Sequence, residues 1–340
     1  MAQTVEYRQV GKSGLRISVP IIGTMGIGSQ KWTTWVIPEE EAMTLLKAAW
    51  DSGLNTIDTA NMYSNGESES AIKRFIEKFE IPREKLVIMD KIYNLVASDV
   101  ATFVPLMPGL SKTRDYVNQG GLSRTAIINQ VDACLFRLGT TYIDLLQVHT
   151  FDPTTPIEET MKTLHDLVTS GKVRYIGASN MRAWQVAEMN NAAERNGWTQ
   201  FISMQVEHSL LYRTQEVEMF AYCNHKGMGI FAYSPLMDGH LARPDGVEST
   251  RSKSVKGSFF EKKRRESDKE IIRRVEELAK KHAWKMSQVA LAWSATKVCS
   301  PIVGANSLQR LQESMTTGKA LTAEEVKYLE EPYEYQPYRW

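Results

Sequence analysis

The chain has 340 residues, of which 42% are hydrophobic and 24% are charged. This balance is typical of a folded globular protein and excludes an intrinsically disordered chain. Lys and Arg number 41 and Asp and Glu 40, so the net charge is +1, and no overall charge favours nucleic acid or an anionic membrane as a partner.

The cysteines and the apolar runs indicate the cellular compartment of the protein. Cys134, Cys223 and Cys299 are widely spaced, with no Cys-x-x-Cys pair and no zinc-type spacing with histidine. An odd cysteine count and an N-terminus without an apolar leader predict reduced thiols in the cytoplasm. No run reaches about 18 apolar residues, so we expect no membrane segment. We also expect no metal.

Short β-rich apolar runs alternate with helical patterns along the chain. Ala42, Leu45, Leu46 and Ala49, for example, recur at the spacing of one helix face. The strand runs are apolar on successive residues, which is typical of parallel strands buried on both faces. Eight strand–helix units predict the α/β fold class, as a (β/α)8 TIM barrel. The eight expected strands are 18–25, 54–60, 85–93, 142–150, 173–180, 201–208, 229–236 and 301–306.

Several segments exceed a minimal barrel, although we expect a single domain over 1–340. They are an N-terminal β-hairpin at 1–17, long loops at 94–122 and 237–268, and an aromatic C-terminal tail at 321–340. Loops that follow barrel strands surround the catalytic face, and long loops in compact domains are usually functional or disordered.

Polar residues stand at the ends of three expected strands. Asp58 and Tyr63 follow the second strand, Lys91 lies on the third and His149 ends the fourth. An ammonium lowers the pKa of a neighbouring phenol, and a carboxylate keeps that ammonium charged. With an imidazole that donates to a developing alkoxide, this set suits reduction of a carbonyl. Each residue alone is more often structural, so the hypothesis depends on their joint placement.

The motifs around these residues resemble the active-site signature of the aldo-keto reductases, over about residues 5–318. Within that family the chain is most similar to fungal versiconal hemiacetal acetate reductases and aryl-alcohol dehydrogenases, through the stretches at 11–20, 117–124 and 151–161. The broader resemblance is carried by Asp58-Thr59-Ala60-x-x-Tyr63 with Gly66 and Glu69, by Lys91 and His149, and by 171–180, Gln205, 233–236 and 302–314.

The resemblance implies roles for the four polar residues. Tyr63 would be the proton donor, Lys91 and Asp58 would tune it, and His149 would orient the carbonyl oxygen. The implied activity is NADPH-dependent reduction of an aldehyde or ketone to an alcohol. The implied partner is a small-molecule carbonyl, of aryl or polyketide-like secondary metabolism. Two alternatives stay open: a cofactor-binding regulatory subunit like the β-subunits of potassium channels, and an enzyme of the same fold that mainly oxidises alcohols.

The resemblance also implies an NADP(H) site. Ser179, Asn180 and Gln205 would hold the nicotinamide carboxamide, and Tyr233 would stack on its ring. Arg310, at the start of the helix after the last strand, favours a 2′-phosphate and therefore NADP over NAD. The implied cofactor-binding residues are Gly23, Thr24, Asp58, Ser179, Asn180, Gln205, Tyr233, Ser234, Leu236, Gly239, Arg243, Gly304, Ser307, Arg310, Glu313 and Ser314.

The sequence also indicates which residues contact the substrate and where the chain differs from the family pattern. Apolar, aromatic walls favour aryl or polyketide-sized carbonyls. Asp90 stands where relatives usually have a small residue; strand alternation directs it away from Lys91 toward the helices, where it needs a partner. His208 is either a second polar group at the pocket or a structural residue. The expected substrate-binding residues are Met25, Trp32, Trp35, Tyr93 and Thr150.

Overall fold

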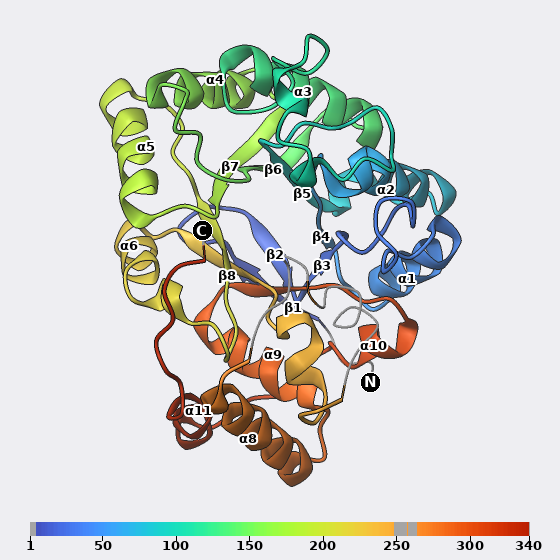
Figure 1. Ribbon diagram of the computed structural model, residues 1–340, viewed down its shortest axis with the longest axis vertical. Helices are drawn as coiled ribbons and strands as arrows, with labels where there is room; N and C mark the ends of the chain where they lie inside the picture. The colour runs from blue at the N-terminus through green and yellow to red at the C-terminus, as the bar shows by residue number, and fades with distance from the viewer. Residues whose placement is uncertain (1–4, 248–256, 258–263, 340) are drawn as a thin grey trace.

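A closed barrel of eight parallel strands forms the centre of the protein in a computed structural model (Figure 1). The structure describes residues 5–247, 257 and 264–339. Each of the eight expected strands overlaps one strand of the barrel, so the (β/α)8 TIM barrel is confirmed. The strands are β3 (Ile21–Gly23), β4 (Thr56–Asp58), β5 (Val87–Ile92), β6 (Ile143–Val148), β7 (Val173–Ser179), β8 (Ser203–Glu207), β9 (Gly229–Tyr233) and β10 (Ser300–Val303).

The first expected strand, 18–25, is divided in the structure. Its first residues belong to β2 (Arg16–Val19), which pairs antiparallel with β1 (Glu6–Gln9). Proline has no N–H for a β-ladder, and Pro20 separates this hairpin from β3. The expectation of one strand was therefore wrong, and the hairpin extends two residues beyond position 17.

The β1–β2 hairpin closes the end of the barrel opposite the strand carboxyl ends. Val10 and Ile17 are fully buried in a cluster with Met89, Leu145 and Phe231, which come from three barrel strands. The hairpin turn also contacts the loop before β9, where the Lys12 N–H donates to the Gly227 carbonyl at 2.8 Å. A Cβ at Gly11 would lie 2.2 Å from that same oxygen, so this turn requires glycine.

A layer of helices surrounds the barrel (Figure 1). Their apolar stripes explain the packing: α1 buries Ala42, Leu45, Leu46 and Ala49, as the spacing predicts. Capping fixes their ends, as where the Ser123 hydroxyl accepts the N–H of Ala126. The helices are α1 (Glu39–Asp51), α2 (Glu67–Lys78), α3 (Arg124–Leu138), α4 (Ile157–Thr169), α5 (Ala183–Asn196), α6 (Met219–Lys226), α8 (Glu266–His282), α9 (Met286–Lys297), α10 (Leu308–Gln312) and α11 (Ala323–Glu330).

The long segments flank the strand carboxyl ends. The 94–122 loop contains two short 3₁₀ turns, η3 (Val104–Leu106) and η4 (Leu110–Lys112). The 237–268 segment begins with the turn η6 (Met237–Ala242) and ends inside α8, so its last three residues are helical and not loop. Positions 248–256 and 258–263 of that segment lie outside the described residues.

The C-terminal tail contains α11 and then returns to the barrel. Figure 1 shows the chain after α11 running back toward β8. The Thr214 hydroxyl donates to the Gln336 carbonyl at 2.6 Å, and Arg339 Nη1 lies 2.6 Å from Glu207 Oε1. Glu207 is the last residue of β8, so the tail packs on the loops at this edge of the barrel.

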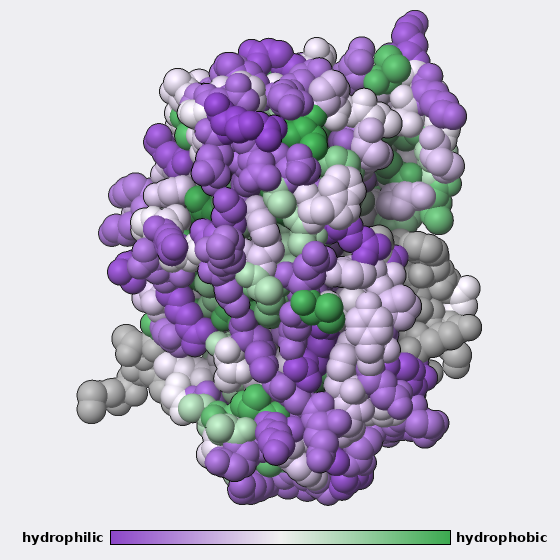
Figure 2. All heavy atoms as spheres, turned by 90° about the vertical axis from the view of Figure 1, so that its left-hand side faces the viewer, coloured by the Kyte–Doolittle hydropathy of each residue, from purple (hydrophilic) through white to green (hydrophobic). Residues whose placement is uncertain are grey.

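The surface is mostly polar. Figure 2 shows a face on which hydrophilic residues dominate and hydrophobic side chains gather in small separate groups. Within the described ranges, no helix combines the length and the apolar character that a membrane crossing needs.

Candidate active site at the carboxyl end of the barrel

Asp58, Tyr63, Lys91 and His149 converge at the carboxyl ends of neighbouring strands. Asp58 ends β4, Lys91 lies on β5, His149 follows β6, and Tyr63 begins the 3₁₀ turn η1 (Tyr63–Gly66). The Lys91 ammonium donates to Asp58 Oδ2 at 2.6 Å and to the Thr59 carbonyl at 2.7 Å. It also lies 5.3 Å from the centre of the Tyr63 ring. The structure therefore brings the four residues together.

Asp58 is held from its second oxygen as well. Gln205 Nε2 donates to Asp58 Oδ1 at 2.8 Å, and Gln147 Nε2 lies 3.3 Å from the same atom. Both amides are buried. Gln147 was not expected from the sequence, although a polar residue two positions before His149 in an apolar strand shares its face of the sheet.

The Lys91 amine stays protonated in this buried place. Burial alone would lower its pKa, but the charge and the hydrogen bond of the Asp58 carboxylate oppose burial, and the pKa is raised above the ordinary lysine value. For Tyr63 the balance differs from the expected lowering. Burial raises the pKa of the Tyr63 phenol by more than Lys91 lowers it, so the phenol keeps its proton at neutral pH.

His149 is uncharged at neutral pH. Burial and the nearby Lys91 ammonium lower its pKa to about 3. Its ring meets the Tyr63 ring edge-on, with ring centres 6.2 Å apart. Its Nδ1 is buried and has no hydrogen-bond partner among the described residues.

Three of the expected nicotinamide residues form one network beside His149. Asn180 Nδ2 donates to the His149 carbonyl at 3.2 Å and to Ser179 Oγ at 3.1 Å. The Tyr233 hydroxyl donates to Asn180 Oδ1 at 2.8 Å. Asn180 adopts a left-handed backbone conformation (φ 48°), which asparagine tolerates better than most residues, and Thr150 Oγ1 donates to its carbonyl at 3.3 Å.

An aromatic wall stands next to Tyr63. Met25, Trp32 and Trp35 pack in one cluster with Tyr63, and Phe103 joins them from the 94–122 loop. The Trp32 ring centre is 5.3 Å from that of Phe103 and 6.3 Å from that of Trp35. Three of the five expected substrate residues are thus assembled.

Tyr93 and Thr150 have other contacts, and Thr150 is bonded to the Asn180 carbonyl. Tyr93 packs against the main core, and its N–H donates to Gln130 Oε1 at 3.0 Å. Neither residue is part of the cluster that contains Tyr63.

Gly23 and Thr24 lie at the end of β3, against the base of the site. The Thr24 hydroxyl donates to the Asp58 carbonyl at 3.1 Å and accepts from Ser68 at 2.8 Å. A Cβ at Gly23 would lie 2.8 Å from Ile302 Cγ2, so this strand end has no room for a side chain.

The remaining expected cofactor residues lie on two segments that follow β9 and β10. Ser234, Leu236, Gly239 and Arg243 follow β9, and Gly304, Ser307, Arg310, Glu313 and Ser314 follow β10. Burial and the Arg310 charge both lower the pKa of Arg243, so the two guanidinium groups, which come from separate segments, repel each other. Among the described residues, no carboxylate forms an ion pair with either arginine. Such a pair is suited to bind a phosphate.

The helix α10 region is organised by its own side chains. Ser307 accepts the Arg310 N–H at 3.3 Å, and the Ser314 hydroxyl donates to the Arg310 carbonyl at 2.8 Å. The Glu313 carbonyl accepts from the Ser287 hydroxyl. These bonds fix the backbone around Arg310, while its side chain is exposed.

The His208 side chain packs among core residues. Its fully buried ring stacks on Trp293, with ring centres 5.1 Å apart, and its Nε2 lies 2.8 Å from Glu216 Oε1. The structural interpretation of His208 is therefore confirmed.

The model of the aldo/keto reductase family matches residues 21–334 of the chain. The chain belongs to this family. It is an oxidoreductase that acts on carbonyl or alcohol groups, and the family generally uses NAD(P)H. It is 49% identical over 342 residues to an aldo-keto reductase of Fusarium vanettenii, covering 98% of this chain and 92% of that protein.

Two further relatives extend over nearly the whole chain. The versiconal hemiacetal acetate reductase of Aspergillus parasiticus is 46% identical over 334 residues, with 97% of each chain covered. A Saccharomyces cerevisiae protein classed with the aryl-alcohol dehydrogenases is 43% identical over 339 residues, with 98% of this chain and 99% of that protein covered. The expected resemblance to the fungal branch of the family is confirmed.

Proposed function

We propose that the protein reduces an aldehyde or ketone to the alcohol, with NADPH as hydride donor and Tyr63 as proton donor. The observation that carries this proposal is the position of Lys91, bonded to Asp58 and facing the Tyr63 ring beside a neutral His149. Relatives that cover nearly the whole chain carry enzyme names, which favours catalysis over the role of a regulatory subunit.

The chain's own residues supply proton and geometry. Because His149 Nδ1 is buried without a partner, the favoured neutral tautomer carries its proton on Nε2, since an unpaired lone pair costs less than an unpaired N–H. That Nε2–H would donate to the substrate oxygen while Tyr63 transfers its proton to it. The Lys91 ammonium would stabilise the phenolate left on Tyr63, and Asp58 would hold Lys91 in place.

The nicotinamide, when bound, supplies the hydride. The residues present fit this group: Ser179 and Asn180 offer polar atoms beside His149, and Tyr233 is held by its bond to Asn180. Gln205 is already bonded to Asp58, so it would link the cofactor to the catalytic carboxylate. We assign the adenosine end to the segment after β10.

NADP is proposed over NAD because Arg243 and Arg310 repel each other and neither has a carboxylate partner among the described residues. A phosphate group would offset the repulsion between two guanidiniums, and a ribose hydroxyl would not. Arg310 would then contact the 2′-phosphate.

The substrate proposed is an aryl or polyketide-like carbonyl. Trp32, Trp35 and Phe103 form an apolar, aromatic wall beside Tyr63, which suits an aromatic ring more than a charged sugar. The names of two relatives, an aryl-alcohol dehydrogenase and a versiconal hemiacetal acetate reductase, point to the same class. The cytoplasmic location and a role in secondary metabolism stay predictions.

A nucleotide titration tests the cofactor assignment first. Purified full-length protein is titrated with NADPH and with NADH, and binding is followed by nucleotide fluorescence. We expect tight NADPH binding and much weaker NADH binding, followed by turnover of aryl aldehydes. Binding of neither nucleotide would refute the proposed function.

Alcohol oxidation is the second candidate, supported by the dehydrogenase names among the relatives. The same residues would serve in reverse, with the Tyr63 phenolate as the base. The raised pKa of Tyr63 favours reduction at neutral pH. Product analysis in both directions at pH 7 and pH 10 distinguishes the two.

A further inference from the structure

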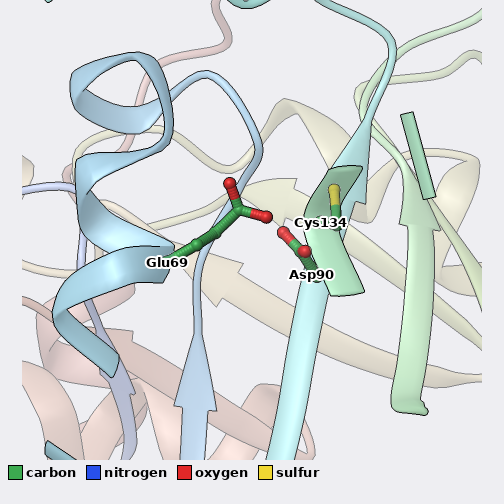
Figure 3. Close-up of side chains that lie close together, drawn as sticks. All are labelled: Glu69, Asp90 and Cys134. Atoms are coloured by element: carbon green, nitrogen blue, oxygen red, sulfur yellow. The ribbon is translucent and has the colours of Figure 1, made fainter. Parts of the chain in front are cut away.

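A second group of ionisable side chains lies behind the site, on the outer side of β5. Glu69 comes from α2, Asp90 from β5, and Cys134 and Arg137 from α3. Glu69, Asp90 and Cys134 are fully buried. Asp90 faces the helices, opposite to Lys91, as strand alternation predicts, and Figure 3 shows how the three side chains lie.

Two carboxylate oxygens in this group face each other without a donor. Arg137 Nε donates to Glu69 Oε2 at 2.6 Å, and the Lys91 N–H donates to Asp90 Oδ1 at 2.8 Å. The other oxygens, Glu69 Oε1 and Asp90 Oδ2, are buried and have no donor among the described residues. Figure 3 shows the two carboxyl groups directed at one another.

The charge of the group is unbalanced if both carboxyl groups are ionised. Arg137 is one cation against two anions. Burial raises the pKa of the Cys134 thiol well above its usual range, so the thiol adds no charge. The Lys91 ammonium is bonded to Asp58 on the other face of β5. One buried negative charge and two opposed lone pairs would remain, and an arrangement of this kind is costly.

We propose that Glu69 and Asp90 share one proton, and that this carboxyl–carboxylate pair positions Lys91 against Tyr63. The proton sits between Glu69 Oε1 and Asp90 Oδ2, so both orphan oxygens gain a partner and the charge of Arg137 is balanced by one anion. Burial and the neighbouring Asp90 raise the pKa of Glu69 well above its ordinary value. Burial also raises the pKa of Asp90.

The pair connects the two elements that carry the catalytic groups. Glu69 lies in the first turn of α2, which directly follows the turn η1 that begins at Tyr63. Asp90 precedes Lys91 on β5 and accepts its N–H. The shared proton therefore joins the Tyr63 element to the Lys91 strand. The effect on turnover rests on the proposed function, whereas the shared proton does not.

A bound metal ion is the competing explanation. One possible ligand atom from each of Glu69, Asp90 and Cys134 lies within 4.8 Å of the others. Arg137, however, already occupies Glu69 at 2.6 Å and lies 3.6 Å from Cys134 Sγ. A guanidinium at that position repels a divalent cation, so a proton fits the site better.

Infrared spectroscopy of the full-length protein detects the shared proton directly. At pH 7 we expect the C=O stretching band of a protonated carboxyl group in the wild type and its loss in Asp90→Asn and Glu69→Gln, where an amide replaces the proton as donor. Cys134→Ala, the matched control, keeps the band. A wild type without the band, or Zn²⁺ bound at one per chain and lost in Cys134→Ala, overturns the proposal.

Stability against pH gives a readout that does not depend on activity. The folded pKa of Glu69 is raised, so the stabilisation is complete below its unfolded pKa and is lost as pH rises through the folded pKa. Denaturation at increasing pH, starting from pH 4.5, should show this fall in the wild type and a flatter profile in Asp90→Asn. Equal slopes for both proteins contradict the shared proton.

Turnover tests the positioning role. Asp90→Ala should lower kcat by roughly 10- to 100-fold, as misplacement by about 1 Å can, with NADPH affinity retained. Asp90→Asn should recover most of that loss, because its amide can still bridge to Glu69. An unchanged kcat in Asp90→Ala refutes the positioning role. Loss of NADPH binding by the wild type would instead refute the proposed function.

Discussion

Lys91 Nζ and Asp58 Oδ2 lie 2.6 Å apart, and the two side chains are 1% and 4% exposed. An ion pair this deeply buried pays a large desolvation cost and stays favourable only when its remaining atoms are bonded. Thr59, Gln147 and Gln205 supply those bonds. The pair therefore belongs to a complete polar network, whose members depend on each other.

Removing one member of this pair should destabilise the fold as well as stop catalysis. Lys91→Met leaves Asp58 as an uncompensated buried charge, for which we expect a loss of about 3–5 kcal/mol in the free energy of unfolding. Chemical denaturation measures this. Lys47→Met is the matched control, because Lys47 pairs with Asp51 at the surface and should cost less than about 1 kcal/mol. Similar losses in both variants would contradict the argument.

Tyr63→Phe should separate proton transfer from cofactor binding. We expect kcat to fall by roughly 10²- to 10⁴-fold, the usual contribution of a positioned general acid, while the Kd for NADPH stays unchanged. Steady-state kinetics and a fluorescence titration measure the two quantities. Tyr328→Phe, which alters a half-buried tyrosine of α11 bonded to Glu277, should leave both unchanged. Wild-type turnover in Tyr63→Phe would rule out its role.

The pH dependence of reduction should show no step near pH 6.5. His149 titrates at about 3 because burial and Lys91 disfavour its charged form, so it stays neutral throughout the working range. Tyr63 must be protonated to donate, and its raised pKa places the fall in kcat above pH 10. A kcat profile between pH 5 and 10.5 checks this. An acid limb near pH 6.5 would assign His149 a charged role.

Arg310→Ala should weaken the binding of NADPH and leave the binding of NADH unchanged. Loss of a charge-assisted bond to phosphate costs about 1.5–3 kcal/mol, which corresponds to roughly 10- to 100-fold in Kd, and NADH affinity should not change. Titrations with both nucleotides measure the ratio. Arg114→Ala, at an exposed arginine of the 94–122 loop, serves as the control. Equal weakening of NADPH and NADH would place Arg310 away from the 2′-phosphate.

Trp32→Ala should change the choice of substrate. Its ring packs against Phe103 beside Tyr63, so its removal should raise KM for aryl aldehydes more than for short aliphatic aldehydes. The control is Trp184→Ala, since Trp184 is 58% exposed. Parallel changes in KM for both substrate classes would show that Trp32 only supports the fold.

The sequence predicts the barrel and the convergence of Asp58, Tyr63, Lys91 and His149, to which we assign catalysis, because both depend on local rules. Strand alternation places Lys91 inward and Asp90 outward, and the carboxyl ends of parallel strands meet at one edge. Those rules depend only on neighbouring residues in the sequence. The positions of Asp58 and His149 at strand ends could therefore be predicted without knowledge of any tertiary contact.

Contacts between distant segments could not be predicted in this way. Arg137 reaches Glu69 across 68 residues, and Gln205 reaches Asp58 across 147. The direction of the pKa shift of Tyr63 could not be predicted either, because burial raises this pKa while Lys91 lowers it. The division of the first strand at Pro20 was missed because the apolar run continues through the proline.

The β1–β2 hairpin closes the amino end of the barrel, where Val10 and Ile17 pack on Met89, Leu145 and Phe231. A cofactor and a substrate that react at the carboxyl end therefore have to enter and leave from that end. The molecule that binds deeper in the barrel has to enter first and leave last. If the nicotinamide is that deeper molecule, product inhibition should show an obligatory order, with cofactor exchange waiting on the departure of the alcohol.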